Sequence, residues 1–70
     1  MDLTNKQIRI TRTSANYVPP SSIIWVDVLE EPVPGVRKVY ASFELMFDEA
    51  YGDPSNPALL TAVTEKLATL

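Results

Sequence analysis

The chain has 70 residues, a net charge of −3 and 46% hydrophobic residues, which is the composition of one small globular domain rather than of a disordered segment. It contains no Cys and no His, so disulfides, zinc sites of the Cys/His type and His-based catalytic triads are excluded. The acidic balance disfavours non-specific binding to nucleic acid, which depends on excess positive charge. Domains this small that have no disulfides are commonly stabilised by oligomerisation.

No apolar run approaches the roughly 20 residues that a membrane-spanning helix needs. The N-terminal stretch, MDLTNKQIRI, lacks the apolar core of a signal peptide. We therefore expect a single soluble, cytoplasmic domain over residues 1–70, with no membrane as its partner.

The first predicted element is a half-buried strand over residues 6–13, KQIRITRT, in which Ile8 and Ile10 point to the same face. The polar side chains point to the opposite face: Gln7, Arg9 and Thr11. Residues 14–22, SANYVPPSS, follow as a predicted loop, because the Pro19–Pro20 pair cannot donate hydrogen bonds to a sheet ladder.

A second strand is predicted over residues 22–31, SIIWVDVLEE, which are rich in β-branched and aromatic side chains. Strict alternation places one set on one face: Ile24, Val26 and Val28. It places another set on the opposite face: Ile23, Trp25, Asp27 and Leu29. Residues 30–35, EEPVPG, end the strand with two prolines and a glycine, as a hairpin turn does.

The third strand, predicted over residues 36–49, shows the clearest alternation. Its apolar face consists of Val39, Ala41, Phe43, Leu45 and Phe47. Its opposite face consists of Lys38, Tyr40, Ser42, Glu44, Met46 and Asp48. Such half-solvated alternation is typical of an antiparallel sheet.

The chain closes with a predicted helix over residues 56–70, in which Asn56 is the N-cap and Pro57 takes the first helical position. One apolar stripe runs along it: Leu59, Leu60, Val63, Leu67 and Leu70. The predicted fold is therefore α+β: a small antiparallel sheet of about three strands, followed by one C-terminal amphipathic helix packed on it.

Three carboxylates, Asp48, Glu49 and Asp53, lie close together between the third strand and the helix. Asp53-Pro54 and Asn56-Pro57 are typical of a turn and a helix cap, and the calcium-loop pattern fails at Ala50 and Gly52, so we interpret the segment as a bend without a metal. The chain has no Gly-rich phosphate loop, and its carboxylates lie at positions predicted to be solvated. We therefore expect neither enzymatic activity nor a cofactor.

One helix covers only one face of a three-stranded sheet, and Trp25, Tyr40 and Met46 lie at positions that it does not reach. Two interpretations stay open for these side chains. The loop over residues 13–22 folds across them, or they form an interface, where Trp, Tyr and Met are favoured.

The order of the elements resembles the C-terminal half of the coat proteins of single-stranded RNA bacteriophages. The residues that carry the resemblance are EEPVPGVRKVYASFELMF and GDPSNPALLTAVTEKLATL, preceded by NKQIRITR. As in that family, a Pro-Val turn leads through an Arg into a strand bearing Tyr, a small polar residue and Glu at alternate positions. The similarity covers about residues 5–70, most clearly 30–70.

The resemblance implies a capsid-type structural protein, found in the virion or the host cytoplasm, whose subunits pair their sheets edge to edge and face RNA with the inner face. By position it implies RNA contacts from Tyr40, Ser42, Glu44, Lys6 and Arg9. It also implies that the helix packs on a partner subunit. With Trp25, the predicted interface residues are Leu59, Leu60, Val63 and Leu67.

A protein of another class fits the same features: a small acidic inhibitor or adaptor that binds another protein through Trp25, Tyr40 and the Glu30/Glu31 loop. A coat-like subunit predicts dimers or larger assemblies and salt-sensitive RNA binding. An inhibitor predicts a monomer or dimer without affinity for nucleic acid.

Overall fold

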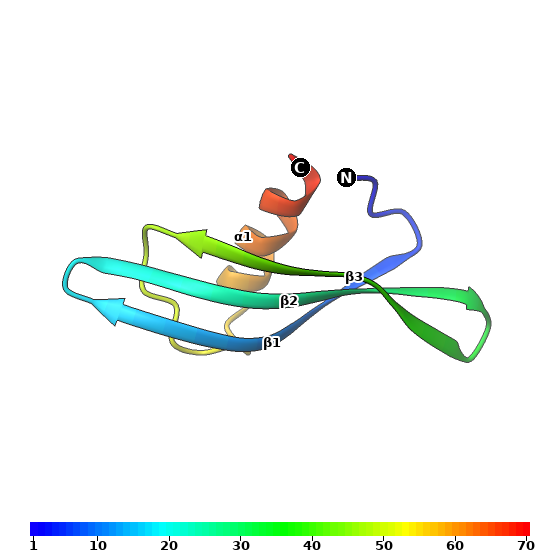
Figure 1. Cartoon of the computed structure of the whole chain (residues 1–70), viewed down its shortest axis with the longest axis horizontal. Helices are drawn as coiled ribbons and strands as arrows, with labels where there is room; N and C mark the ends of the chain where they lie inside the picture. Colours follow the sequence, from blue (N-terminus) through cyan, green and yellow to red (C-terminus); the bar gives the residue numbers. More distant parts are fainter.

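The computed structural model describes all 70 residues as a three-stranded antiparallel sheet followed by one helix (Figure 1). The elements are β1 (Lys6–Tyr17), β2 (Pro20–Val33), β3 (Val36–Phe47) and α1 (Pro57–Ala68). The strands lie in the order β1-β2-β3, so each pairs with its neighbour in the chain. The predicted α+β fold is confirmed.

The prediction of a loop over residues 14–22 is wrong. Ser14 pairs with Ile23 and Asn16 with Ser21, so β1 and β2 continue to a tight turn at Val18-Pro19, which has a cis peptide bond. Both prolines are tolerated because they lie in the turn and at the strand end, where a backbone donor can be spared. Since these residues belong to the sheet, they do not fold over Trp25.

The turn between β2 and β3 is formed by Pro34 and Gly35. Gly35 has φ +85°, a left-handed conformation that a Pro-Gly pair adopts readily in a type II turn. Its backbone N–H donates to the Glu31 carboxylate at 2.6 Å. Residues 31–40, which form this end of the hairpin, are all exposed and project beyond the helix (Figure 1).

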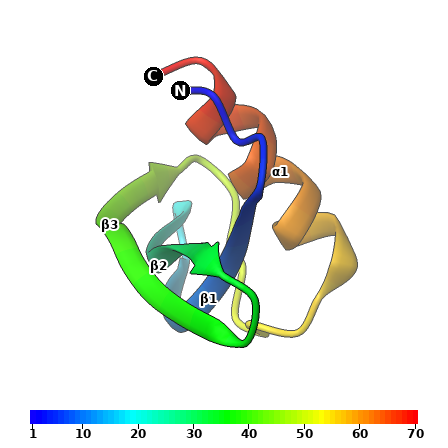
Figure 2. The ribbon, with the colours of Figure 1, turned by 90° about the vertical axis from the view of Figure 1, so that its right-hand side faces the viewer.

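A single hydrophobic core lies between α1 and one face of the sheet (Figure 2). The side chains at its centre are almost completely inaccessible to solvent: Ile24, Val26, Val28, Leu45, Leu59, Val63 and Leu67. Ile8, Ile10, Phe43 and Phe47 pack around them. The predicted core faces of the first two strands, and of β3 from Ala41 onward, are therefore confirmed.

The apolar stripe of α1 is narrower than predicted. Leu59, Val63 and Leu67 repeat every four residues and are fully buried, whereas Leu60 is 45% exposed and Leu70 61% exposed. Leu60 follows Leu59 by about 100° around the helix and so points away from the sheet. The three buried residues pack fully on the chain's own sheet. The predicted contact of Leu59, Val63 and Leu67 with a partner subunit stays a prediction.

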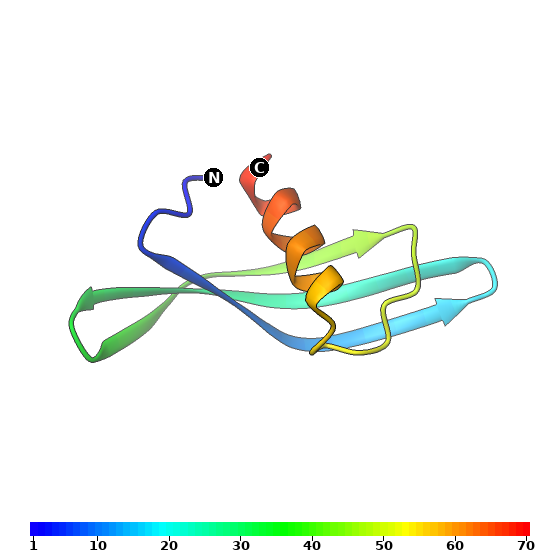
Figure 3. The ribbon, with the colours of Figure 1, turned by 180° about the vertical axis from the view of Figure 1, so that it is seen from behind.

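The chain ends complete the cover on the helix side of the sheet. Met1 packs on the core, and its ammonium group donates to a backbone oxygen of Leu70 at 2.7 Å. The loop from β3 to α1 crosses the opposite end of the sheet, where the buried Ser22 hydroxyl donates to the carbonyl of Glu49 (Figure 3). No helix or loop lies across the other face of the sheet (Figure 3). No helix has the length and apolar character that crossing a membrane requires.

Candidate interaction surface

A bulge in β1 changes which side chains share the bare face of the sheet. Ile10 pairs with Val26 and Arg12 with Trp25, so Thr11 is an extra residue. The hydroxyl of Thr11 donates to the carbonyl of Trp25 at 3.0 Å. Beyond the bulge the alternation is reversed, so Arg12 joins Arg9 on the same face.

Three consecutive rungs of paired residues make up the part of this surface that we call the open face, and a further rung, Gln7–Leu29–Val39, follows toward the hairpin end. Each rung has one side chain from β1, one from β2 and one from β3. The rungs are Arg9–Asp27–Ser42, Arg12–Trp25–Glu44 and Ser14–Ile23–Met46. The open face therefore grades from a charged end to an apolar end, with Trp25 at its centre.

At the charged end, Asp27 is held from both sides. Arg9 donates from Nη2 to one carboxylate oxygen at 2.9 Å, and the Ser42 hydroxyl donates to the other at 2.9 Å. The hydrogen bond from Arg9, and then that from Ser42, lower the pKa of Asp27 below its ordinary value. Asp27 is therefore ionised at neutral pH and its charge is largely balanced within the chain.

In the central rung, the guanidinium of Arg12 stacks on the ring of Trp25, with 3.9 Å between its Cζ and the ring centroid. Glu44 flanks Trp25 from β3. A shallow depression of ≈ 250 Å³ is lined here by Thr11, Trp25, Asp27, Ser42 and Glu44, among others. An amphipathic aromatic ring is thus presented between a cation and a carboxylate.

In the apolar rung, Ile23 is partly exposed and Met46 is 69% exposed. Nothing in the chain packs over either side chain from above the open face. Trp, Met and Arg are the residue types that protein interfaces favour. The open face has the chemistry of a binding surface rather than that of a catalytic site.

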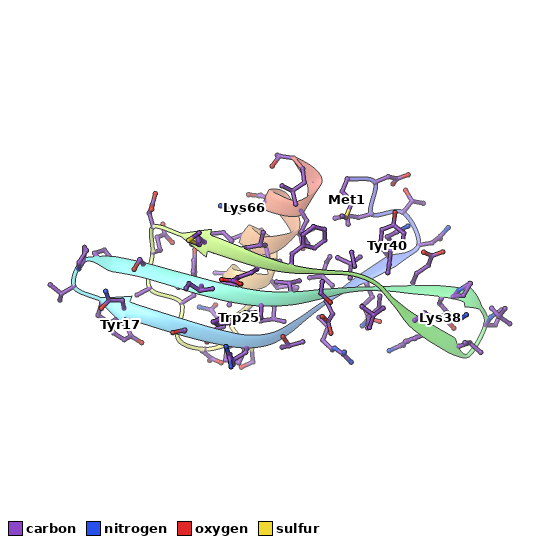
Figure 4. The ribbon with its side chains drawn as sticks, viewed as in Figure 1. Met1, Tyr17, Trp25, Lys38, Tyr40 and Lys66 are labelled. Carbon is purple, nitrogen blue, oxygen red and sulfur yellow. The ribbon has the colours of Figure 1, made fainter.

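The predicted common face for Tyr40, Ser42 and Glu44 is wrong for Tyr40. In β3, Ala41 pairs with Val28 and Val39 with Leu29, so Tyr40 is the extra residue of a second bulge. Its ring lies 4.4 Å from the Lys6 ammonium, on the helix side of the sheet, whereas Trp25 lies on the other side (Figure 4). The bulge also turns Val39 out of the core, and its side chain is 55% exposed.

The predicted RNA-contact residues are therefore divided between two faces. Lys6 and Tyr40 meet on the helix side, beside the N-terminal segment, whereas Arg9, Ser42 and Glu44 lie on the open face. Of the predicted interface residues, Trp25 lies on the open face and Leu60 on the outer side of α1. Arg12 was not among the predicted site residues, because simple alternation gives no sign of the bulge at Thr11.

Two of the three carboxylates between β3 and α1, Glu49 and Asp53, accept local hydrogen bonds, as expected of a bend. Asp53 accepts hydrogen bonds from the backbone N–H and the hydroxyl of Ser55, which lower its pKa. The Asn56 side chain accepts from the N–H of Ala58 at 3.0 Å and caps the helix. The Tyr51 hydroxyl donates to the carboxylate of Glu49.

Comparison of the chain with models of protein families, with curated proteins and with solved structures finds no match. What the protein does is therefore inferred from the geometry and chemistry of the sheet itself.

Proposed function

We propose that the chain is a non-enzymatic structural or assembly protein whose copies associate with one another through the open face. The observation that carries the proposal is that Trp25, Ile23 and Met46 share a sheet face that the chain leaves bare. A domain of this size gains stability from covering such a face. Association therefore supplies a layer on the face of the sheet that α1 does not cover.

Features at both edges of the sheet disfavour association by strand addition. They therefore favour association through the open face. The carbonyl of Met46, on the edge strand β3, accepts a hydrogen bond from the Lys66 ammonium at 2.6 Å. Both edge strands also carry a bulge, at Thr11 in β1 and at Tyr40 in β3. Lysines and bulges are the devices by which proteins prevent strand addition at sheet edges.

A coat-like role with RNA as a partner stays part of the proposal as a prediction from the resemblance. The open face carries Arg9 and Arg12 against Asp27 and Glu44, so its formal charges balance. A surface that binds phosphate needs uncompensated cations. For this reason the open face is assigned first to self-association, and RNA is tested in the same experiment.

Binding to a different protein is the second candidate function. It is favoured by the exposed end of the β2–β3 hairpin, where Val33 and Val36 are 57% and 45% exposed. An inhibitor or adaptor of this kind binds through the hairpin, and the purified protein is then a monomer or dimer without affinity for nucleic acid.

The test is light scattering of the purified protein over a salt series, with absorbance at 260 nm recorded alongside. We expect a mass of at least twice 7.8 kDa for the wild type, and the monomer mass for Trp25→Ser and for Met46→Glu. Tyr17→Ser is the matched control, because Tyr17 is exposed but lies outside the open face. A wild-type monomer at every concentration contradicts the proposal, and absorbance at 260 nm that salt removes supports the RNA contact.

A further inference from the structure

We propose that two copies pack open face against open face about a two-fold axis parallel to β2, and that the Arg12 of each copy pairs with the Glu44 of the other. The resulting dimer is a six-stranded sandwich with helices on both outer sides. This inference rests on the proposed self-association and specifies its geometry.

The positive and negative charges of the open face lie on opposite edge strands. Both arginines, Arg9 and Arg12, lie on β1, whereas Glu44 lies on β3 with β2 between them. Asp27, on β2, is already neutralised by the ion pair with Arg9. One side of the open face is thus cationic and the other side is anionic, which makes the surface complementary to a second copy of itself in one orientation.

The charges select the direction of the two-fold axis. An axis parallel to β2 lays β1 of one copy over β3 of the other, so each Arg12 faces a Glu44. An axis perpendicular to the strands, through the central rung, lays β1 over β1 and brings the two Arg12 side chains together. Juxtaposed like charges at an interface are unfavourable, so the parallel axis is favoured. Facing sheets whose strands align within about 30° are the common sandwich geometry.

The central strand supplies the apolar contact in this arrangement. Trp25 and Ile23 lie on β2, so each meets its own copy close to the axis. Facing sheets are about 10 Å apart, which long side chains from both sides fill together. Met46 lies over the small side chain of Ser14 in the other copy, because these two residues end the same rung. Large side chains therefore meet small ones at the edges of the contact.

The three-stranded part of the sheet is large enough for a small interface, below the standard size. All three strands are paired alongside residues 22–30 of β2, a stretch that at ~3.3 Å per residue is about 30 Å long, and three strands are about 14 Å wide. The flat footprint is therefore roughly 400 Å², and the accessible area of its side chains is larger. A standard interface buries about 800 Å² on each partner.

The experiment exchanges charges between the two strands. We expect Arg12→Glu and Glu44→Arg each to raise the dimer dissociation constant at least about tenfold, because each creates two like-charge contacts. Mixing the two variants restores association to within about threefold of the wild type, since each Glu then meets an Arg. The double variant in one chain restores the homodimer for the same reason. The single tryptophan, Trp25, reports association directly through its fluorescence.

Arg37→Glu is the matched control, because it reverses the same kind of charge on the exposed hairpin end. It should leave the dissociation constant unchanged. Circular dichroism of each variant checks that the sheet and helix are intact.

The possible failures are distinguishable. If the wild type is a monomer, with or without bound nucleic acid, the proposed self-association and this geometry both fall. If the wild type is a dimer that Trp25→Ser dissociates, but the mixed charge variants do not recover, self-association stands and this axis is overturned. Dissociation by the Arg37→Glu control to the same extent also overturns it.

Discussion

Asp27 is the side chain that organises the charged end of the open face. It accepts one hydrogen bond from Arg9 and another from Ser42, and so links β1 and β3 across β2. Both bonds favour the ionised carboxylate, and the pKa of Asp27 is accordingly lowered. Because the pair is exposed to solvent, its contribution to stability is modest and sensitive to salt.

This arrangement predicts a pH-dependent difference between the wild type and Asp27→Asn. A carboxyl whose pKa is lowered by folding stabilises the fold above its ordinary pKa of 3.8, and this stabilisation is lost as the pH falls through the lower folded value. The wild type should exceed the variant in the free energy of unfolding by a constant amount above about pH 5. The difference should shrink below pH 3.8.

Urea titrations at several pH values, with both proteins at the same concentration, measure that difference. Asp2 and Asp53 also have lowered pKa values, but they are present in both proteins and cancel. If the difference in the free energy of unfolding stays the same between pH 5 and pH 2, the pKa of Asp27 is the same in the folded and the unfolded protein, which contradicts the prediction.

Two single residues decide the composition of the open face, and neither could be predicted from the sequence. Thr11 and Tyr40 are extra residues in their strands, and each reverses the alternation beyond it. Threonine and tyrosine are ordinary strand residues, so their types carry no sign of a bulge. As a result Arg12 was missed, and Tyr40 was assigned to the wrong face.

At the scale of the elements, the sequence predicted what hydrophobic periodicity and capping control. Ile24, Val26 and Val28 form the buried line of β2, and Asn56 caps α1, both as expected. The continuation of β1 and β2 past residue 14 was not predicted, because serines, asparagine and prolines normally indicate a loop. Pairing between the two strands overrides that preference in the structure.

The helix provides a matched pair of substitutions. Leu67 is fully buried and Leu60 is 45% exposed. Leu67→Ala should lower the free energy of unfolding by about 2–5 kcal/mol, whereas Leu60→Ala should change it by about 0.5 kcal/mol or less. A domain of this size has a total of only about 4–10 kcal/mol, so Leu67→Ala should be largely unfolded under mild denaturant.

Thermal or urea unfolding followed by circular dichroism distinguishes the two variants. Equal losses from both substitutions would indicate that α1 packs on a second chain through its outer side as well. Dissociation without unfolding in Leu67→Ala would indicate that Leu67 serves an interface, as the resemblance to coat proteins first implied.

The helix and the chain segments that flank it cover one face of the sheet, and the other face is bare. The helix, the N-terminal segment and the loop before the helix all lie on the same side of the sheet. The opposite side presents Trp25 between a cation and a carboxylate, and the edges beside it are interrupted by bulges and by Lys66. Association through the open face explains all of these features together.

The most direct measurement is cross-linking through a single introduced cysteine, which is selective because the chain has no cysteine of its own. Ser21→Cys introduces a thiol on the central strand β2, on the open-face side, and Ala68→Cys introduces one at the exposed end of α1. Treatment with a short bismaleimide should convert the Ser21→Cys protein to a covalent dimer and leave the Ala68→Cys protein monomeric. Cross-linking of Ala68→Cys alone, or of neither protein at concentrations where the wild type is associated, would contradict association through the open face.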